Sequence, residues 1–375
     1  MTNGRRRHPT RPNRHGARFD AAHAELRRLR GALLAQADPA DGAGIARWAD
    51  RPGGGLVLTG RDGLAAAQEV LGAGFGRPVL VDAACYVRNR THRRSRLSAS
   101  WIDWQHGCGL PLALTDSAYI GQGDIESLRL VLAQAADLGP GVVAVLPLHS
   151  SWLVDDLNQL CAAVGDAEIP IALVIDHASD PLGVTSIVDG LLRLLLLGIP
   201  VMVLRADVSV VGALCFGGHT AAVGLRANLR SRTPRRRAEH QSVLVPHLLR
   251  FVDQRQLDAA MLADPQSATP LLRCDCEVCD GADLSWLAAT TEPREFGDAH
   301  TVSALLRLRD SALAAGAGSM RCQDSWSMRC VAAVERHHQL AESLYGLPPQ
   351  PALRTWAAAS GVAGLPQPSS ATNRS

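Results

Sequence analysis

Lysine, aromatic residues and long apolar runs are what this sequence lacks. All 38 of its basic residues are arginine, and aromatic side chains make up 4% of its 375 residues. No apolar run approaches the roughly 20 residues that a membrane-spanning helix needs, so the sequence predicts no membrane span. The arginine-rich first 30 residues contain no apolar core, so a secretory signal peptide is not expected.

Cysteine is present, but not in the pattern of a secreted protein. The nine cysteines are an odd number, and six of them are scattered along the chain. A disulfide framework is therefore not expected. On this basis we predict a cytoplasmic protein in a reducing compartment.

Short apolar runs alternate with helical stretches through the first two thirds of the chain. Runs that are almost wholly apolar are typical of parallel strands buried on both faces. The seven runs are 56–60, 78–86, 111–119, 142–149, 171–176, 201–207 and 220–225. This alternation predicts an α/β fold, a TIM (β/α)8-type barrel, whose eighth strand lies near 257–262 or is missing from an irregular barrel. No Gly-x-Gly-x-x-Gly follows the first run, which disfavours a dinucleotide-binding sheet.

The segments around the predicted barrel differ from it in composition. Residues 1–18 are basic and rich in Pro, Gly and Asn, which predicts a disordered arm. Apolar residues at helical spacing predict a helix over 20–36, at the start of a barrel domain that spans 19–265. Residues 266–346 hold a cysteine cluster and helical sequence, so they are expected to form a helical C-terminal region. Residues 347–375 are rich in Pro and Ser and are expected to form a disordered tail.

Polar residues stand at the ends of the predicted strands. The carboxyl ends of barrel strands form the face that carries active sites. Any single Asp or Ser at such an end is best explained as a helix N-cap, whereas several acids together favour a polar site. These residues are Asp82, Asp116, Ser117, His149, Asp176, His177, Arg205 and Asp207.

The cysteine cluster has the spacing Cys-x-Cys-x-x-Cys and predicts a structural zinc site. Thiolates bind zinc tetrahedrally, and four protein ligands leave no position open for catalysis. The expected ligands are Cys274, Cys276, Cys279 and His300, the last standing just before a predicted helix. Cys322 and Cys330 are rivals for the fourth position. A redox pair is the alternative, which the third cysteine and the late position in the chain disfavour.

This arrangement resembles the zinc motif of the tRNA-guanine transglycosylases, which follows a (β/α)8 barrel and includes a His-led helix. A second match is the Thr-Asp-Ser segment at 115–117, which stands in the right chain order. The family's Gly-Gly-Phe-Gln is replaced here by residues 118–124, AYIGQGD, and its Phe-Asp-Cys segment with the nucleophile is absent. The chain therefore resembles a divergent paralogue over residues 55–315.

The resemblance implies exchange of a guanine for a 7-deazaguanine-type base in tRNA or DNA. In this chemistry an Asp attacks the ribose anomeric carbon, and a second acid manages the protons on the two bases. Asp116 matches the family's acid–base position. Asp207 is the first candidate for the nucleophile and Asp176 the second, both as strand-end acids without a motif match. Candidate substrate-binding residues are Ser117, Asp176, His149 and Arg205.

Three basic segments would suit a nucleic-acid partner: 1–18, 88–96 and 226–237. Solvated arginine-rich loops are the alternative explanation. Two other functions stay open. One is a non-catalytic member of the fold that binds nucleic acid or supports a partner subunit. The other is an unrelated barrel enzyme acting on a small phosphorylated substrate. The sequence leaves homo- or hetero-dimerisation open.

Overall fold

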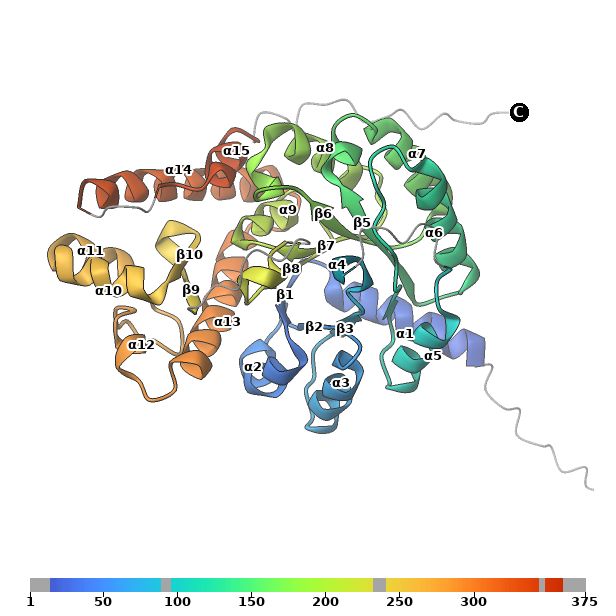
Figure 1. Ribbon diagram of the computed structural model, residues 1–375, viewed down its shortest axis with the longest axis horizontal. Helices are drawn as coiled ribbons and strands as arrows, with labels where there is room; N and C mark the ends of the chain where they lie inside the picture. Colours follow the sequence, from blue (N-terminus) through green and yellow to red (C-terminus); the bar gives the residue numbers. More distant parts are fainter. Residues whose placement is uncertain (1–13, 89–95, 232–240, 344–347, 360–375) are drawn as a thin grey trace, which may run out of the picture.

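The computed structural model describes residues 14–88, 96–231, 241–343 and 348–359. Eight parallel strands form a nearly closed barrel with helices around it (Figure 1). The strands are β1 Ala32–Ala37, β2 Leu56–Thr59, β3 Val79–Asp82, β4 Ala113–Leu114, β5 Val142–His149, β6 Ile171–Asp176, β7 Val201–Ala206 and β8 Thr220–Gly224. Their order is β3-β2-β1-β8-β7-β6-β5-β4, which is the chain order wound round an axis and open between β3 and β4. The predicted α/β barrel is therefore confirmed.

The barrel interior is a packed core. Successive side chains of a strand point to opposite faces, so every second residue belongs to the interior and the others face the helices. The interior cluster includes Leu34, Val57, Leu80, Val143, Val145, Ala172, Val174, Met202, Leu204 and Ala222, each at most 2% exposed. Helix α1, Arg14–Leu29, adds Ala22 and Leu29 to this cluster, so it closes the amino-terminal end of the barrel.

Helices cover the outside of the barrel. They are α2 Gly42–Ala49, α3 Gly63–Gly72, α5 Ala99–Gly107, α6 Ile125–Asp137, α7 Leu157–Ala167, α8 Thr185–Leu195 and α9 Val211–Cys215, whereas the short α4 Cys85–Arg88 packs Tyr86 and Val87 on the interior cluster. Side chains cap two of them: Ser98 accepts the Trp101 N–H at the start of α5, and Asp124 accepts the Ser127 N–H at the start of α6.

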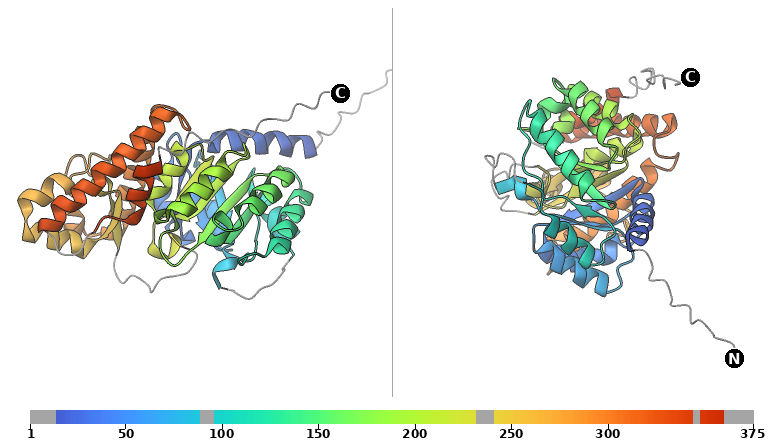
Figure 2. Two further views of the ribbon diagram at one scale, coloured as in Figure 1. Left: turned by 90° about the horizontal axis from the view of Figure 1, so that it is seen from above. Right: turned by 90° about the vertical axis from the view of Figure 1, so that its right-hand side faces the viewer.

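After β8 the chain builds a C-terminal subdomain that projects from one side of the barrel (Figures 1 and 2). A two-stranded antiparallel ribbon begins it, β9 Ser242–Val245 and β10 Arg250–Asp253. Its helices are α10 Gln254–Ala263, α11 Pro265–Leu272, α12 Trp286–Ala289, α13 Pro293–Ala312, α14 Met320–Ser343 and α15 Pro351–Ala359. Helix α13 returns to the barrel and packs against β1 and α2, so it completes the outer layer beside β8.

Four sequence-based predictions are wrong at the level of elements. The eighth strand is β1, and 257–262 lies within helix α10. The helix predicted over 20–36 ends at Leu29, because Gly31 at φ +70° turns the chain into β1. The arm predicted over 1–18 is helical from Arg14, and residues 1–13 lie outside the described part. The tail predicted to be disordered from 347 contains α15, whose Ala352, Leu353 and Trp356 are buried; residues 360–375 are not described.

Among the described residues, no helix is both long enough and apolar enough to cross a membrane.

Candidate functional site

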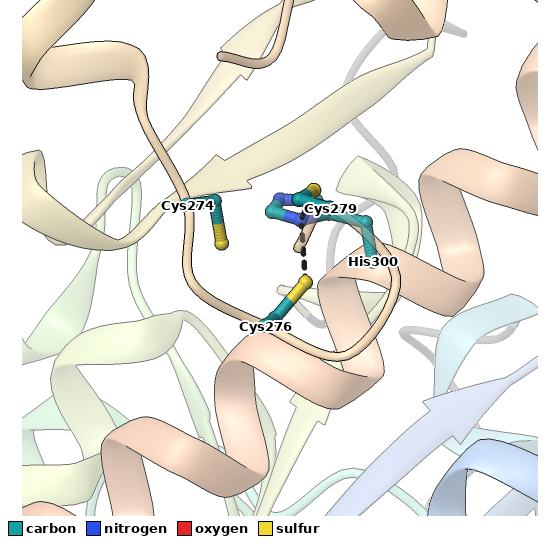
Figure 3. Close-up of side chains that lie close together, drawn as sticks. All are labelled: Cys274, Cys276, Cys279 and His300. Atoms are coloured by element: carbon teal, nitrogen blue, oxygen red, sulfur yellow. Dashed lines mark hydrogen bonds between the residues drawn. The ribbon is translucent and has the colours of Figure 1, made fainter. Parts of the chain in front are cut away.

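Three cysteines and one histidine meet in the C-terminal subdomain (Figure 3). The ligand atoms of Cys274, Cys276, Cys279 and His300 all lie within 4.8 Å of one another, and all four residues are buried. His300 Nδ1 is 3.4 Å from Cys276 Sγ and 3.2 Å from Cys279 Sγ. This group can hold a metal ion. The rival ligands Cys322 and Cys330 lie on a different element, α14. Cys322 interacts there with Cys215 of α9, since burial and then Cys322 raise the pKa of Cys215.

The backbone of the cysteine loop is folded so that its three sulfurs converge. The N–H groups of Cys279 and Asp280 both bond to the Cys276 carbonyl, at 3.1 and 2.9 Å, and the Gly281 N–H bonds to the Cys274 carbonyl at 3.0 Å. Asp280 and Gly281 close the loop in the left-handed region, at φ +49° and +82°. Glycine suits the second of these positions because it has no Cβ to strain there.

His300 is oriented by a second hydrogen bond. Its Nε2 donates to the carbonyl of Leu244 in β9 at 2.7 Å, which leaves Nδ1 facing the sulfurs. Metal-bound histidines typically donate their other ring N–H in this way. The residue lies inside α13 rather than before the helix as predicted, and it is 0% exposed.

Hydrogen bonds within this group shift the pKa of His300 and of Cys276. Burial lowers the pKa of His300, but the hydrogen bonds with Cys274 and Cys276 together outweigh this effect. The pKa of His300 is therefore raised, to about 9. Hydrogen bonds from Cys274 and then Cys279 lower the pKa of the Cys276 thiol. A metal ion bound here would therefore displace protons from these groups.

Above the apolar interior of the barrel, the next layer toward the carboxyl ends of the strands is polar. Gln36, Thr59 and Asp82 each stand two residues beyond an interior apolar residue. Gln36 Nε2 donates to Thr59 Oγ1 at 3.2 Å and to Asp82 Oδ2 at 3.3 Å. The Tyr86 hydroxyl donates to Asp82 Oδ2 at 2.6 Å, and the Ala84 N–H donates to Oδ1 at 2.9 Å. Asp82 is thus a fully buried acceptor that holds Tyr86 in place, and burial and then Asp82 raise the pKa of Tyr86.

Arg205, near the end of β7, reaches this polar layer. Its backbone has φ +53° at a bulge in the strand, and its N–H bonds to Gln36 Oε1 at 2.7 Å. The guanidinium carbon lies 5.7 Å from the centre of the Tyr86 ring, and Nη2 donates to the Asn228 carbonyl at 3.4 Å. The residue is only 5% exposed, yet its Nε and Nη1 have no hydrogen-bond partner in the described part of the chain. Buried donors without partners are costly, so the mouth offers these two N–H groups to a ligand.

Asp116 lies just beyond β4 and is half-buried. Its Oδ1 accepts the Ser98 N–H at 3.0 Å. Its negative charge also acts on Cys85, which follows β3: burial and then Asp116 raise the pKa of the Cys85 thiol. The neighbouring Ser117 is buried and bonds to the Thr115 hydroxyl at 2.8 Å.

Asp176 and His149 end adjacent strands, β6 and β5, and their Cα atoms are register partners. Asp176 stands two residues beyond the interior residue Val174 and is 7% exposed, so it belongs to the polar layer. His149 Nδ1 accepts the Ser151 N–H at 3.2 Å, which leaves the proton of the neutral ring on Nε2. His177 makes the corresponding loop contact with Ser179.

Asp207, predicted as the nucleophile, is used structurally. Its Oδ1 accepts the Val208 N–H at 2.6 Å and caps the short 3-10 helix Val208–Val210. Its Oδ2 lies 3.6 Å from Arg230 Nε, and the Arg230 guanidinium stacks on the ring of Phe251 in β10 at 3.8 Å. Asp207 therefore stabilises the boundary between the barrel and the C-terminal subdomain. This agrees with the explanation of a strand-end Asp as a helix N-cap.

The start of the basic segment 226–237 is also internal. Arg226 pairs with Asp298 of α13 and with Asp41, the latter at 3.1 Å. Arg230 pairs with Asp207. Residues 89–95 and 232–240 lie outside the described part of the chain, so the remaining arginines of the two loop segments are not placed.

Sequence reasoning missed the residues that surround the acids: Gln36, Thr59, Cys85 and Tyr86. A signal for one of them was present. Gln36 is the single polar residue of the apolar run 32–37, and a polar side chain in a strand buried on both faces needs a buried partner.

No protein-family model and no curated protein matches this chain.

Proposed function

We propose that this protein exchanges a guanine for a 7-deazaguanine-type base in tRNA or DNA, like the tRNA-guanine transglycosylases that it resembles. The observation that carries the proposal is the place of Asp116. This acid of the Thr-Asp-Ser segment lies at the carboxyl end of β4, half-buried and oriented by the Ser98 N–H. Both Asp116 and Asp82 of the polar layer act on Cys85, since burial, then Asp116 and then Asp82 raise its pKa, and the Cys3His group follows the barrel in the expected chain order.

We place the nucleophile at Asp176 rather than Asp207 because Asp176 belongs to the polar layer of the mouth, two residues beyond the interior residue Val174, whereas Asp207 caps a helix at the boundary with the C-terminal subdomain. In the proposed reaction a carboxylate oxygen of Asp176 bonds to the ribose anomeric carbon as the bond to guanine breaks. Asp116 protonates the departing guanine and takes a proton from the incoming base. The incoming base then displaces Asp176 from the same carbon. The target nucleotide must leave its stack to reach these groups.

We propose zinc as the metal of the Cys3His group. With bonds of about 2.0 Å to nitrogen and 2.3 Å to sulfur, tetrahedral zinc places these ligand atoms roughly 3.5 Å apart. The two distances from His300 Nδ1, 3.4 and 3.2 Å, fit that value. Four protein ligands leave no open position, so this zinc would stabilise the subdomain and take no part in the reaction. A reducing cytoplasm suits the nine free cysteines.

The test is incorporation of labelled guanine, or of a labelled deazaguanine, into tRNA and into duplex DNA. Asp116→Asn should abolish incorporation and leave the melting temperature nearly unchanged, because Asn fills almost the same volume and still accepts the Ser98 N–H. Asp176→Asn should abolish incorporation and also any covalent adduct with nucleic acid. Asp137→Asn, at the carboxyl end of α6, is the matched control and should keep full activity.

The proposal fails if the wild-type protein incorporates no base into any tested tRNA or duplex, alone or with a partner subunit.

A second candidate function is non-catalytic binding of nucleic acid, either alone or beside a catalytic partner. Two observations favour it. The first is that Asp207 is engaged in structural contacts. The second is that no acid stands at the carboxyl end of β8, where Gly224 is followed by Leu225 and the ion-paired Arg226. Tight binding of tRNA or DNA without an adduct or base exchange would support this candidate.

A third candidate is a barrel enzyme for a small phosphorylated substrate. The Nε and Nη1 of the buried Arg205, which have no hydrogen-bond partner among the described residues, favour it because guanidinium binds phosphate well. Absence of zinc from the purified protein would favour it over the first two.

A further inference from the structure

A concave site lies largely in the C-terminal subdomain and shares no residue with the polar layer at the barrel mouth. It is a cleft of about 990 Å³ between α13 and α14, with the cysteine loop and the segment after β9 at its edge. We call it the arginine cleft. Six arginines and three aspartates line it: Arg51, Arg273, Arg307, Arg321, Arg329 and Arg336, with Asp275, Asp310 and Asp324.

Most of the positive charge of the arginine cleft is uncompensated. Of the six arginines only Arg51 has an ion pair in the described part of the chain, with Glu277 at 3.0 Å. Conversely, the lining residue Asp310 is already paired with Arg309, which lies outside the cleft. The cleft is therefore strongly positive and attracts a polyanion.

Several of these arginines are held in position by backbone carbonyls. Arg336 Nη1 donates to the His247 carbonyl at 3.2 Å, and Arg273 Nε donates to the Gly281 carbonyl at 3.0 Å. Arg329 Nη2 donates to the Ser311 carbonyl at 3.4 Å, while its Nε is buried without a partner in the described residues. Such bonds orient a guanidinium without neutralising it. Donors are thus left directed toward a ligand.

The arginines of α14 form a row. Arg321, Arg329 and Arg336 lie on one face of the helix, and the row spans 15 residues, or about 22 Å at ~1.5 Å per residue. Each strand of a nucleic-acid duplex carries one phosphate per ~3.4 Å of its axis. A row of this length can contact several phosphates of one strand.

We propose that the arginine cleft binds the sugar-phosphate backbone of a nucleic acid. Its volume is at the upper limit of roughly 300–1,000 Å³ for small-molecule sites. Among the described residues no Phe, Tyr or Trp lines it, so this part of the chain supplies neither the aromatic anchors of a protein interface nor the platforms on which bases stack. Contacts limited to phosphate position a nucleic acid without reading its sequence. Binding at this cleft does not depend on base-exchange chemistry in the barrel.

The test is the salt dependence of binding by the full-length protein. Labelled tRNA and a labelled DNA duplex of equal length are titrated over roughly 50–200 mM NaCl, where the logarithm of the affinity falls linearly with the logarithm of salt. The double variant Arg307→Ala/Arg321→Ala removes two exposed arginines that have no ion pair in the described chain. Its slope should be shallower by about 1.4–1.8, since each phosphate contact contributes roughly 0.7–0.9.

The matched control removes two exposed arginines from the barrel, Arg27→Ala/Arg129→Ala, and should keep the wild-type slope. Equal slopes for the two double variants would overturn the proposal. Displacement of the nucleic acid by poly-glutamate at equal charge would overturn it in favour of an acidic peptide. A wild-type protein that exchanges no base, but whose salt slope becomes shallower in Arg307→Ala/Arg321→Ala, would contradict the proposed base exchange and support the cleft, so the two failures are separate results.

Discussion

At the scale of single residues, one hydrogen bond distinguishes His300 from an ordinary core histidine. Its Nε2 proton is committed to the Leu244 carbonyl at 2.7 Å, which presents Nδ1 to the sulfurs. The sequence could predict the ligands because three of the four stand within six residues. It could not predict the Leu244 contact, which joins residues 56 positions apart.

We expect about one zinc per chain and its loss in Cys276→Ser, because a serine hydroxyl is a poor zinc ligand beside two thiolates. The melting temperature should fall as well, since zinc binding is coupled to folding. Metal analysis and thermal unfolding measure both effects. Cys161→Ser, at a half-buried cysteine of α7, is the control and should retain full zinc. Full zinc and unchanged melting in Cys276→Ser would rule the site out.

Asp207 gives a second residue-scale prediction. Asp207→Ala should cost about 1 kcal/mol of unfolding free energy, because it removes an N-cap, whereas Asp207→Asn keeps a capping oxygen and should cost less. Denaturant unfolding measures both. If Asp207→Asn abolished base exchange without loss of stability, Asp207 would regain its place as the nucleophile.

At the scale of elements, the sequence predicted seven of the eight strands because each is an apolar run between helical stretches. It missed β1 because Leu33 and Leu34 continue the helical spacing of Ala22, Leu26 and Leu29. Only the turn at Gly31 separates α1 from β1, and one glycine is a weak local signal. In helix α10, five of the six residues at 257–262 are apolar and the other is Asp258, and so short a run does not distinguish a strand from a helix.

Helix α15 lies in a segment whose richness in Pro and Ser predicts disorder, yet it is a packed helix. Trp356 is fully buried against α9, where a Cβ added to Gly212 would lie 2.6 Å from its ring. We therefore expect Trp356→Ala to cost about 3–5 kcal/mol of unfolding free energy. Arg354→Ala, at an exposed position of the same helix, should change it by less than about 0.5 kcal/mol. Equal unfolding curves for the two variants would show that α15 does not stabilise the fold.

At the scale of the whole molecule, α13 joins the barrel to the subdomain. Its first half carries Asp298, which pairs with Arg226 beyond β8, and His300 of the metal group. Its second half packs Leu305 and Leu306 on β1, and Arg309 Nε donates to the Gly31 carbonyl at 2.8 Å. Neither this bridge nor the arginine cleft is visible in the sequence, because both are made by residues far apart in the chain.

This division of α13 predicts where removal of the metal is felt. In hydrogen exchange, a chelator should speed exchange in the cysteine loop, in β9 and in the first half of α13, because the ligand that ties them together is lost. Exchange in the second half of α13 and in β5 and β6 should stay slow, since their packing involves no metal ligand. The chelator should cause no further change in Cys276→Ser. Faster exchange throughout the barrel would mean that the metal supports the whole fold, and unchanged exchange in the cysteine loop would mean that it holds no metal there.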